Sequence, residues 1–248
     1  MKKVFLVVVI AALASSCKKD KAAADTMPIF KKNLIAVSAP GQSEWNIFYS
    51  NDRKLLSFSN NEMNVTYKPG VPFTAKKTQS GFVHEYKNAV QDALGRVTKI
   101  DRFVAGQLIS KQEFKYNAEG YLIEQTVTAA SPNSFAKYVY EYQNGNLTTV
   151  TVYEGGAKTG AFIFDYYTNL INPLQIDLFD FKGVQLVTDV QFGKQSKNLV
   201  KTAKMVTGSG QLFAEINLSY TTDADGYITT ITHSMVGQAP RIYTCSFQ

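Results

Sequence analysis

The sequence predicts an all-β protein, a long antiparallel meander of repeated hairpins that curls into a barrel, a half-barrel or a sandwich. Aromatic and β-branched residues alternate with polar ones in many runs, including 107–116, 135–142 and 160–167. Turn signals such as Asn144-Gly145 separate these runs. Helical periodicity is nearly absent. A meander of roughly fifteen strands must curl or close to protect its edges and bury one face.

The first part of the chain, residues 1–16, is predicted to be a signal peptide and not part of the fold. Lys2 and Lys3 precede an apolar run, residues 4–13, which is too short to cross a bilayer as a mature helix. Small residues follow and end at Cys17. This order resembles a bacterial lipoprotein signal, which implies that Cys17 is acylated and becomes the new N-terminus.

Residues 17–27 are predicted to be a lipid anchor and a flexible tether, because this stretch is rich in Lys and Ala and has little to bury. Thr26 lies in a triplet, Asp-Thr-Met, that resembles an O-glycosylation acceptor of some secreted bacterial proteins. The rest of the chain, residues 28–248, is predicted to be one all-β domain.

A repeat runs through this domain. Gly95, Gly120 and Gly145 are each 25 residues apart, and a later copy ends its turn at Gly226. Each copy has an aromatic strand, a polar turn that closes on the glycine, and an aliphatic residue two positions later. The glycine suits the turn because its last residue needs left-handed backbone angles. Two hairpins fit in each period, so the repeats are expected to extend a single sheet.

The best copy, from Tyr220 to Ile228, resembles the YD repeats of RHS-type proteins. Together with the signal, residues 80–248 resemble a group of Gram-negative cell-envelope lipoproteins with YD-like repeats. That group has a porin-like β fold and no assigned function. The resemblance implies an outer-membrane lipoprotein that faces the periplasm or the cell surface. It supplies no catalytic residues.

Composition and charge exclude several partner classes. After removal of residues 1–16, the chain keeps 24 basic side chains against 20 acidic ones, a net charge of +4 without a basic block, so nucleic-acid binding is not expected. With lipid on Cys17, Cys245 has no intrachain partner, and we expect it to be a buried core residue. The two histidines, His84 and His233, lie in strand patterns, so neither a metal nor a cofactor is expected.

Aromatic side chains are the best candidates for a binding site. Tyr138, Tyr140 and Tyr142 share one face of a strand, and Trp45 is the only tryptophan. If such rings are exposed, they can stack on sugar rings with an apolar face and a polar edge. Core packing and cross-strand pairing explain the same pattern. Both interpretations stay open from the sequence.

Catalysis is not expected. The strand carboxylates are spread singly along the chain, although a curved sheet could bring two of them to glycosidase distance. These carboxylates are Glu85, Glu113, Glu124, Glu141 and Asp165. The sequence has neither a serine-nucleophile motif nor a phosphate-binding glycine-rich loop before a helix.

The run 107–116 argues against a lipid-facing barrel. One face of this run carries Lys111, Glu113 and Lys115, and a charge on the lipid face costs about 2–4 kcal/mol at the bilayer midplane. We therefore expect a water-exposed domain that hangs from a membrane by its lipid. The expected function is a non-catalytic binding or interaction module for a glycan or an envelope partner. The alternatives are a structural envelope protein and a glycan-processing hydrolase.

Overall fold

The structure, a computed structural model, describes residues 31–68, 73–130, 134–174, 176–184, 186 and 190–248. Within these residues the chain forms sixteen strands and one short 3-10 helix, η1 (Val190–Phe192). The first eight strands are β1 (Leu34–Ser38), β2 (Trp45–Tyr49), β3 (Leu55–Ser59), β4 (Met63–Lys68), β5 (Thr74–Gln79), β6 (Phe82–Gln91), β7 (Val97–Val104) and β8 (Gln107–Tyr116). The others are β9 (Leu122–Ala129), β10 (Phe135–Gln143), β11 (Asn146–Glu154), β12 (Ala157–Ile171), β13 (Asn198–Thr207), β14 (Leu212–Thr222), β15 (Ile228–Met235) and β16 (Arg241–Phe247).

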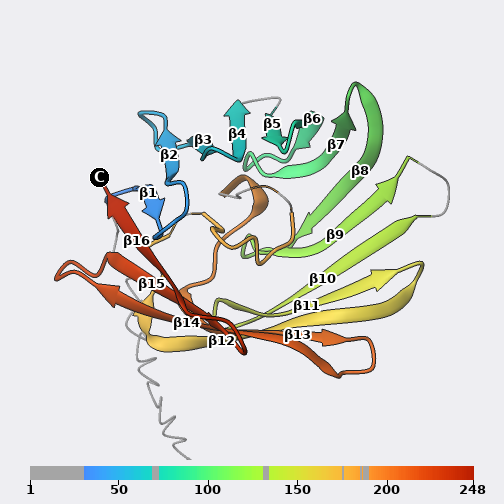
Figure 1. Cartoon of the computed structure of the whole chain (residues 1–248). Helices are drawn as coiled ribbons and strands as arrows, with labels where there is room; N and C mark the ends of the chain where they lie inside the picture. The colour runs from blue at the N-terminus through green and yellow to red at the C-terminus, as the bar shows by residue number, and fades with distance from the viewer. Residues whose placement is uncertain (1–30, 69–72, 131–133, 175, 185, 187–189) are drawn as a thin grey trace, which may run out of the picture.

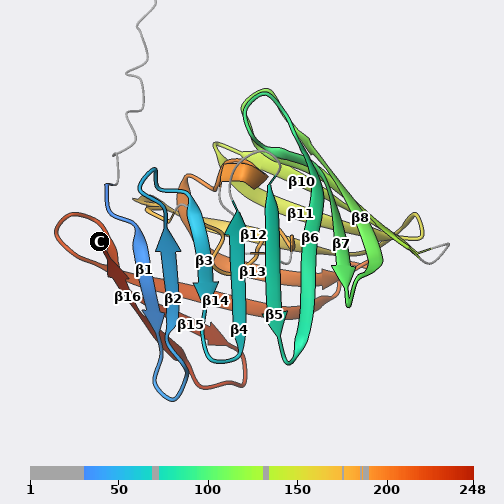
Figure 2. The ribbon, with the colours of Figure 1, turned by 90° about the horizontal axis from the view of Figure 1, so that it is seen from above.

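The strands form a closed antiparallel barrel. Each strand pairs with its neighbours in sequence, and β1 pairs with β16, with Leu34 opposite Phe247 and Val37 opposite Cys245. Figure 1 shows the ring of strands, and Figure 2 shows β1 to β6 side by side with β13 and β14 crossing behind them. The prediction of an all-β hairpin meander is confirmed. Closure decides between the three predicted shapes, because joining β1 to β16 leaves the sheet with no free edge.

The repeat glycines take the predicted backbone conformation. The φ angles of Gly95, Gly120, Gly145 and Gly226 are 77°, 95°, 80° and 85°. The aliphatic residue two positions after each glycine is at most 3 % exposed; these residues are Val97, Leu122, Leu147 and Ile228. Each repeat therefore supplies one tight turn and one core side chain. Because the strands alternate in direction, all four turns lie at the same end of the barrel.

Polar side chains accept hydrogen bonds from the backbone of these turns. The Oδ1 atom of Asp223 accepts hydrogen bonds from the backbone N–H groups of Asp225 and Tyr227, at 3.0 Å and 2.9 Å. Asp92 and Asn117 accept the corresponding bond from the backbone N–H four residues later. The side chain thus acts as part of the turn, the usual role of Asp and Asn there.

The two faces of β8 differ in charge. On β8, Lys111, Glu113 and Lys115 are exposed, whereas Gln112 and Phe114 on the other face are 3 % exposed. The charged face predicted from the sequence is therefore the outer face. Cys245 is 8 % exposed and lies in the core, as predicted.

The interior is occupied by the described residues between β12 and β13, namely 172–174, 176–184, 186 and 190–197, which we call the plug. Figure 1 shows it, in orange, inside the ring of strands. Its buried apolar side chains face the inner wall of the barrel; they are Leu174, Ile176, Val184, Leu186 and Phe192. The sequence pattern did not indicate that this segment lies inside the sheet. It completes the core, because a sixteen-stranded barrel is too wide for its own side chains to fill.

The described chain begins at the end of the barrel that carries the repeat turns. The backbone N–H groups of Lys31 and Lys32 donate to the hydroxyl of Tyr227, at 2.8 Å and 2.9 Å. Asn33 and Gln248 exchange two backbone hydrogen bonds beside it. The predicted signal peptide, Cys17 and Thr26 lie outside the described residues. In the described part of the chain, no helix is long and apolar enough to cross a membrane.

Candidate functional site

The returning part of the plug, residues 190–197, closes the end of the barrel that carries the repeat turns; we call this the closed end. The backbone N–H of Lys194 donates to the carbonyl of Gly120 at 3.0 Å, and that of Lys197 donates to the carbonyl of Gly145 at 2.9 Å. The plug therefore bonds directly to the turns that the repeat provides.

Close packing reinforces this closure. Gly193 has a φ of +84°, and a Cβ atom there would lie 3.0 Å from the carbonyl oxygen of Gly120 and 3.1 Å from the backbone N of Leu122. The ring of Phe192 meets Phe73 and Phe114 edge to face, with centroids 5.7 Å and 5.3 Å apart.

The plug turns around at residues 177–183, which we call the plug tip. Asp177 is 6 % exposed, and its two carboxylate oxygens accept the backbone N–H groups of Phe181 and Lys182, both at 2.9 Å. The Nζ of Lys182, which is 3 % exposed, donates to the carbonyls of Gly193 and Lys194 at 3.2 Å and 3.1 Å. Burial raises the pKa of Asp177, and the charge of Lys182 opposes that shift. Lys182 therefore ties the tip to the closed end, and Asp177 holds the turn from which the Lys182 side chain extends.

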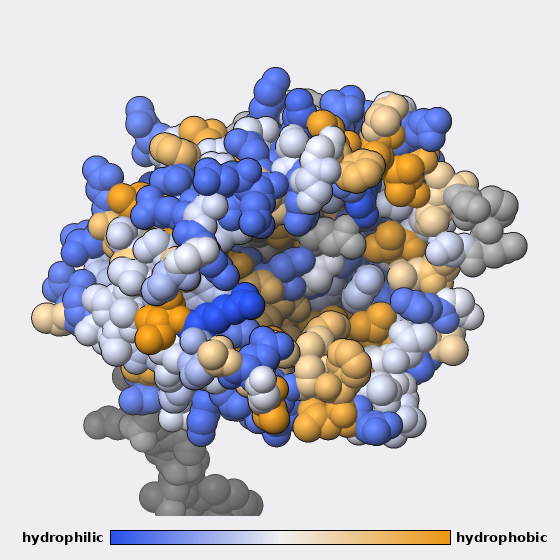
Figure 3. All heavy atoms as spheres, viewed as in Figure 1, coloured by the Kyte–Doolittle hydropathy of each residue, from blue (hydrophilic) through white to orange (hydrophobic). Residues whose placement is uncertain are grey.

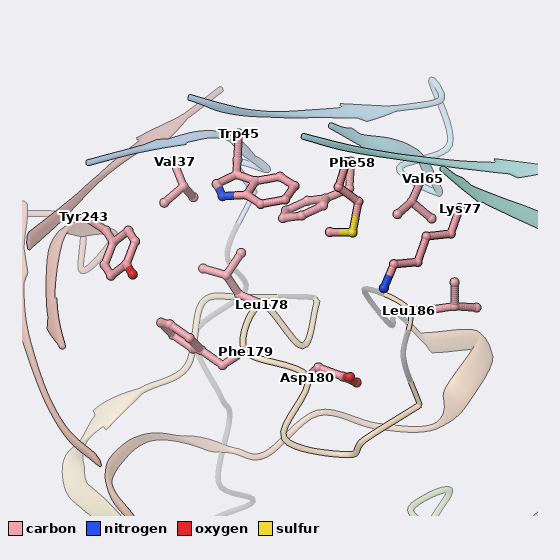
Figure 4. A pocket seen from close by; sticks show the side chains of 11 residues that line it. Val37, Trp45, Phe58, Val65, Lys77, Leu178, Phe179, Asp180, Leu186 and Tyr243 are labelled. Atoms are coloured by element: carbon pink, nitrogen blue, oxygen red, sulfur yellow. The ribbon is translucent and has the colours of Figure 1, made fainter. Parts of the chain in front are cut away.

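At the opposite end, which we call the open end, the plug tip leaves a cavity of about 270 Å³ against β1 to β5 and β16. We call it the Trp45 cavity. Trp45 stacks on Phe58 with ring centroids 4.3 Å apart, and Leu178 of the plug tip points toward this pair (Figure 4). The Phe179 ring lies beside Tyr243, with ring centroids 6.5 Å apart. The lining is Val37, Trp45, Phe58, Met63, Val65, Lys77, Leu178, Phe179, Asp180, Leu186 and Tyr243. Figure 3 shows that this face of the molecule is hollowed.

A second cavity of about 230 Å³ lies on the other side of the plug tip, and we call it the Tyr138 cavity. Its lining is also largely apolar and includes Phe162, Phe164 and Met205 beside Tyr138. A wider depression of about 520 Å³ shares Tyr138, Phe162 and Asp180 with it. The plug tip therefore divides the open end into two aromatic-lined spaces.

Two charged side chains line one side of the Trp45 cavity. Lys77 on β5 and Asp180 on the plug tip both line it. Burial lowers the pKa of Lys77, and the Asp180 carboxylate partly offsets this effect. His84, opposite Lys77 in the sheet, lies with its Nδ1 2.9 Å from Nη2 of Arg102. Burial and the charges of Arg102 and Lys77 lower the pKa of His84, which favours the neutral ring as acceptor.

The structure separates the four aromatic residues singled out in the sequence. Trp45 lines one cavity and Tyr138 lines the other. Tyr140 is 3 % exposed, and its hydroxyl lies 2.7 Å from the carbonyl oxygen of Lys182 and 2.8 Å from Oε1 of Gln125. Tyr142 packs on Tyr121 with centroids 4.6 Å apart. The strand face shared by the three tyrosines points inward, and of the three only Tyr138 lines the cavities of the open end.

Sequence reasoning did not identify Lys77, Phe179, Asp180 or Tyr243 as site residues. Two of them belong to the plug, whose irregular apolar pattern resembles any core segment. Lys77 and Tyr243 look like ordinary strand residues. Their common surroundings arise only when the barrel closes, so no local motif could have revealed them.

The carboxylates considered for catalysis lie on the outer face. Glu113 pairs with Lys99 at 2.7 Å, and Glu124 pairs with Lys115 and Lys137. Asp165 accepts a hydrogen bond from Thr202 at 2.8 Å. The Trp45 cavity, the Tyr138 cavity and the wider depression have one carboxylate in common among their described lining residues. It is Asp180. No group of three or more His, Cys, Asp or Glu side chains in the described ranges is arranged to hold a metal ion.

No protein-family model and no curated protein matches the sequence. Solved structures do match the fold. A porin-like protein from Bacteroides uniformis superposes with a TM-score of 0.64 at 15% identity, covering 89% of this chain and 98% of that chain. A porin-like protein from Bacteroides vulgatus gives a TM-score of 0.57 at 11% identity, covering 86% and 98%. The porin-like barrel that the sequence resemblance implied is thereby confirmed. The lipoprotein signal and the YD-type repeats stay predictions.

Proposed function

We propose that this protein is a lipid-anchored, non-catalytic binding module of the bacterial cell envelope that holds a ligand at the open end of its barrel. One observation carries the proposal: beside the returning part of the plug, at Ser196 and Asn198, the space left is about 50 Å³, whereas the plug tip leaves larger aromatic-lined cavities at the other end. A protein interior is normally close-packed, and few voids exceed a water molecule. Apolar pockets with a few polar groups are the usual form of a small-molecule site.

The composition of the cavities supports a binding role over hydrolysis. Glycoside hydrolysis uses two carboxyl groups on either side of the scissile bond. The described lining of each cavity holds one carboxylate, Asp180, whereas the strand carboxylates point outward. Trp45 and Tyr138 instead offer ring faces, which suit a ligand with an apolar face, whether a sugar ring or a more apolar molecule.

The surface and the entry point of the chain support the proposed location. The outer face of β8 carries Lys111, Glu113 and Lys115, which suits water and not lipid. The chain joins the barrel at the closed end, beside Tyr227. A lipid on Cys17 would therefore attach the closed end to the bilayer through a tether of up to about 3.5 Å per residue, with the cavities at the far end.

A ligand screen tests the binding proposal. The mature chain carrying Cys17→Ser is heated with oligosaccharides, peptidoglycan fragments and amphipathic small molecules, because a ligand of the folded state raises the melting temperature by mass action. We expect one ligand class to raise it, and Trp45→Leu or Tyr138→Leu to reduce the rise. Tyr153→Leu, which removes a ring from the outer face of β11, is the matched control. A rise that neither cavity variant reduces, or no rise at all, would contradict the proposal.

The anchor is tested separately. Mass spectrometry of the protein purified from membranes should show an acylated N-terminal Cys17, and Cys17→Ser should release the protein from the membrane fraction. An unmodified, membrane-free wild-type protein would refute the anchor and leave the binding proposal standing.

A further inference from the structure

The Tyr138 cavity has walls of aromatic rings. On the barrel side, Phe162 and Phe164 of β12 line it. On the plug side, the ring of Phe181 lies edge to face against Phe164, with centroids 5.2 Å apart. Phe179 lies next to Phe181, with ring centroids 5.5 Å apart. These rings pack on one another, so a molecule in the cavity would contact carbon on both sides.

A small residue on the barrel wall makes room for this cavity. Ala203 on β13 is 4 % exposed and lies opposite Phe164 of β12 and Ile216 of β14 in the sheet. All three residues line the cavity, and a larger side chain at position 203 would extend into it. An unfilled apolar cavity costs stability in proportion to its volume. A ligand that fills this space would therefore stabilise the fold.

The cavity has a buried floor and a more exposed mouth. Val150 and Phe164 are at most 3 % exposed. Tyr138, Phe162 and Met205 are only partly buried, and all three also line the wider depression of about 520 Å³. The depression therefore leads into the cavity. The flexible thioether side chain of Met205 lets the mouth adapt to the shape of a ligand.

The two charged residues in the lining, Lys182 and Asp180, already have partners. The Lys182 ammonium donates to two carbonyls of the returning part of the plug, at 3.2 Å and 3.1 Å. The Asp180 carboxylate lies across from Lys77 in the Trp45 cavity (Figure 4), and the two charges stabilise each other. A charged ligand in the Tyr138 cavity would compete with these interactions or bury its own charge unpaired, and both are unfavourable.

A sugar also fits this lining poorly. Each hydroxyl of a buried sugar needs a hydrogen-bond partner, because an unpaired polar group in apolar surroundings is costly. Among the described lining residues, the side-chain hydroxyl is that of Tyr138. The backbone N–H of Lys182 donates to Asp177, and its carbonyl lies 2.7 Å from the Tyr140 hydroxyl, so both groups are in use. An uncharged apolar molecule needs no such partners.

The size of the cavity limits the ligand. An apolar cavity of about 150 Å³ accepts one benzene ring. The Tyr138 cavity, at about 230 Å³, has room for two fused rings or a short acyl chain. We propose that it binds a small, uncharged, apolar molecule of this size, held between the rings of β12 and Phe181 of the plug tip. This inference rests on the proposed binding function and names the ligand class of one of its two cavities.

Two methionines report on the two cavities separately. Met205 lines the Tyr138 cavity and Met63 lines the Trp45 cavity. The mature chain carrying Cys17→Ser, with carbon-13 in its methionine methyl groups, is titrated with naphthalene, 2-naphthoate and 2-naphthylmethylammonium and observed by NMR. We expect naphthalene to shift the Met205 signal and leave the Met63 signal in place. It should bind at least about tenfold more tightly than either ion, because a buried unpaired charge is unfavourable.

Ala203→Leu fills the cavity from its wall. It should abolish the shift of the Met205 signal and weaken naphthalene at least about tenfold, because the new side chain occupies the volume that the ligand needs. Val65→Leu is the matched control, since it enlarges a buried side chain that lines the Trp45 cavity, and it should leave the naphthalene affinity unchanged. The ranking of the three probes in the unsubstituted protein stands even if Ala203→Leu fails to fold.

The outcomes separate this inference from the proposed function. Equal or tighter binding of either ion, a shift of Met63 in place of Met205, or an unchanged naphthalene affinity in folded Ala203→Leu would each overturn the inference. An oligosaccharide that raises the melting temperature, with a smaller rise in Tyr138→Leu and no response to naphthalene, would overturn it and support the proposed function. No response to any ligand would reject both.

Discussion

The two ends of the barrel are made from the same hairpins but are filled differently. At the closed end, a Cβ atom on Gly193 would lie only 3.0 Å from the carbonyl oxygen of Gly120, and Phe192 packs between Phe73 and Phe114. At the open end, the same plug leaves a cavity of about 270 Å³ beside Trp45. An unfilled apolar cavity costs stability in proportion to its volume. We therefore expect substitutions at the closed end to affect stability more than substitutions at the open end, where the proposed binding surface lies.

The largest effect is expected where the plug tip is tied to the closed end. Asp177→Ala removes the acceptor for two backbone N–H groups and leaves Lys182 buried without its nearby carboxylate. Each buried N–H group left without an acceptor costs about 1–3 kcal/mol of unfolding free energy. Urea unfolding measures the loss. Asp177→Asn keeps one acceptor oxygen and should lose less; equal, small losses for both variants would show that the tip is not held by this residue.

Alanine substitutions at two glycines compare the packing at the two ends directly. Both Gly193 and Gly183 have positive φ, so alanine costs about 1–2 kcal/mol in backbone strain at either position. Only Gly193 also lacks space, which adds an overpacking cost of about 1–3 kcal/mol. Denaturant unfolding should therefore show a clearly larger loss for Gly193→Ala than for Gly183→Ala. Equal losses would mean that the residues around Gly193 shift to accommodate a Cβ atom at little cost in free energy.

Two tyrosines on one strand make a finer comparison. Tyr140→Phe removes a buried hydroxyl that lies 2.7 Å from the carbonyl of Lys182, and should cost about 1–2 kcal/mol of unfolding free energy. Tyr138→Phe, whose ring lines a cavity, should stay within about 0.5 kcal/mol. Thermal unfolding of both variants measures the difference. A Tyr138→Phe loss as large as that of Tyr140→Phe would argue that Tyr138 is part of the stabilising core.

The smallest expected effect is a pH dependence near the open end. The folded pKa of His84 lies below its ordinary value of 6.5, so the unfolded chain takes up a proton at higher pH than the folded one. Stability from this residue is then fully present above pH 6.5 and falls as pH drops toward the folded pKa. His84→Gln keeps an acceptor for Arg102 and should flatten part of this decline. His233, whose pKa is also lowered, contributes to the remainder. An unchanged decline in His84→Gln would exclude His84.

Much of the fold could be predicted from local chemistry. The alternation on β8 predicted which face is buried, and the glycine spacing predicted the tight turns at Gly95, Gly120 and Gly145. Both signals are local, because strand periodicity and positive φ act within a few residues. The candidate site was only partly accessible. Trp45 and Tyr138 were identified as aromatic candidates, but the sequence did not show that they line separate cavities.

The sequence by itself determined the strands, their turns, the polar and apolar faces, and the expectation of a lipid on Cys17. Only the tertiary structure decided that β1 meets β16, that the plug enters the barrel, and that Lys77 and Asp180 share a cavity. The physical reason is distance along the chain. Side-chain alternation and turn geometry are set by near neighbours, whereas closure and plugging depend on how much volume a ring of sixteen strands leaves to be filled.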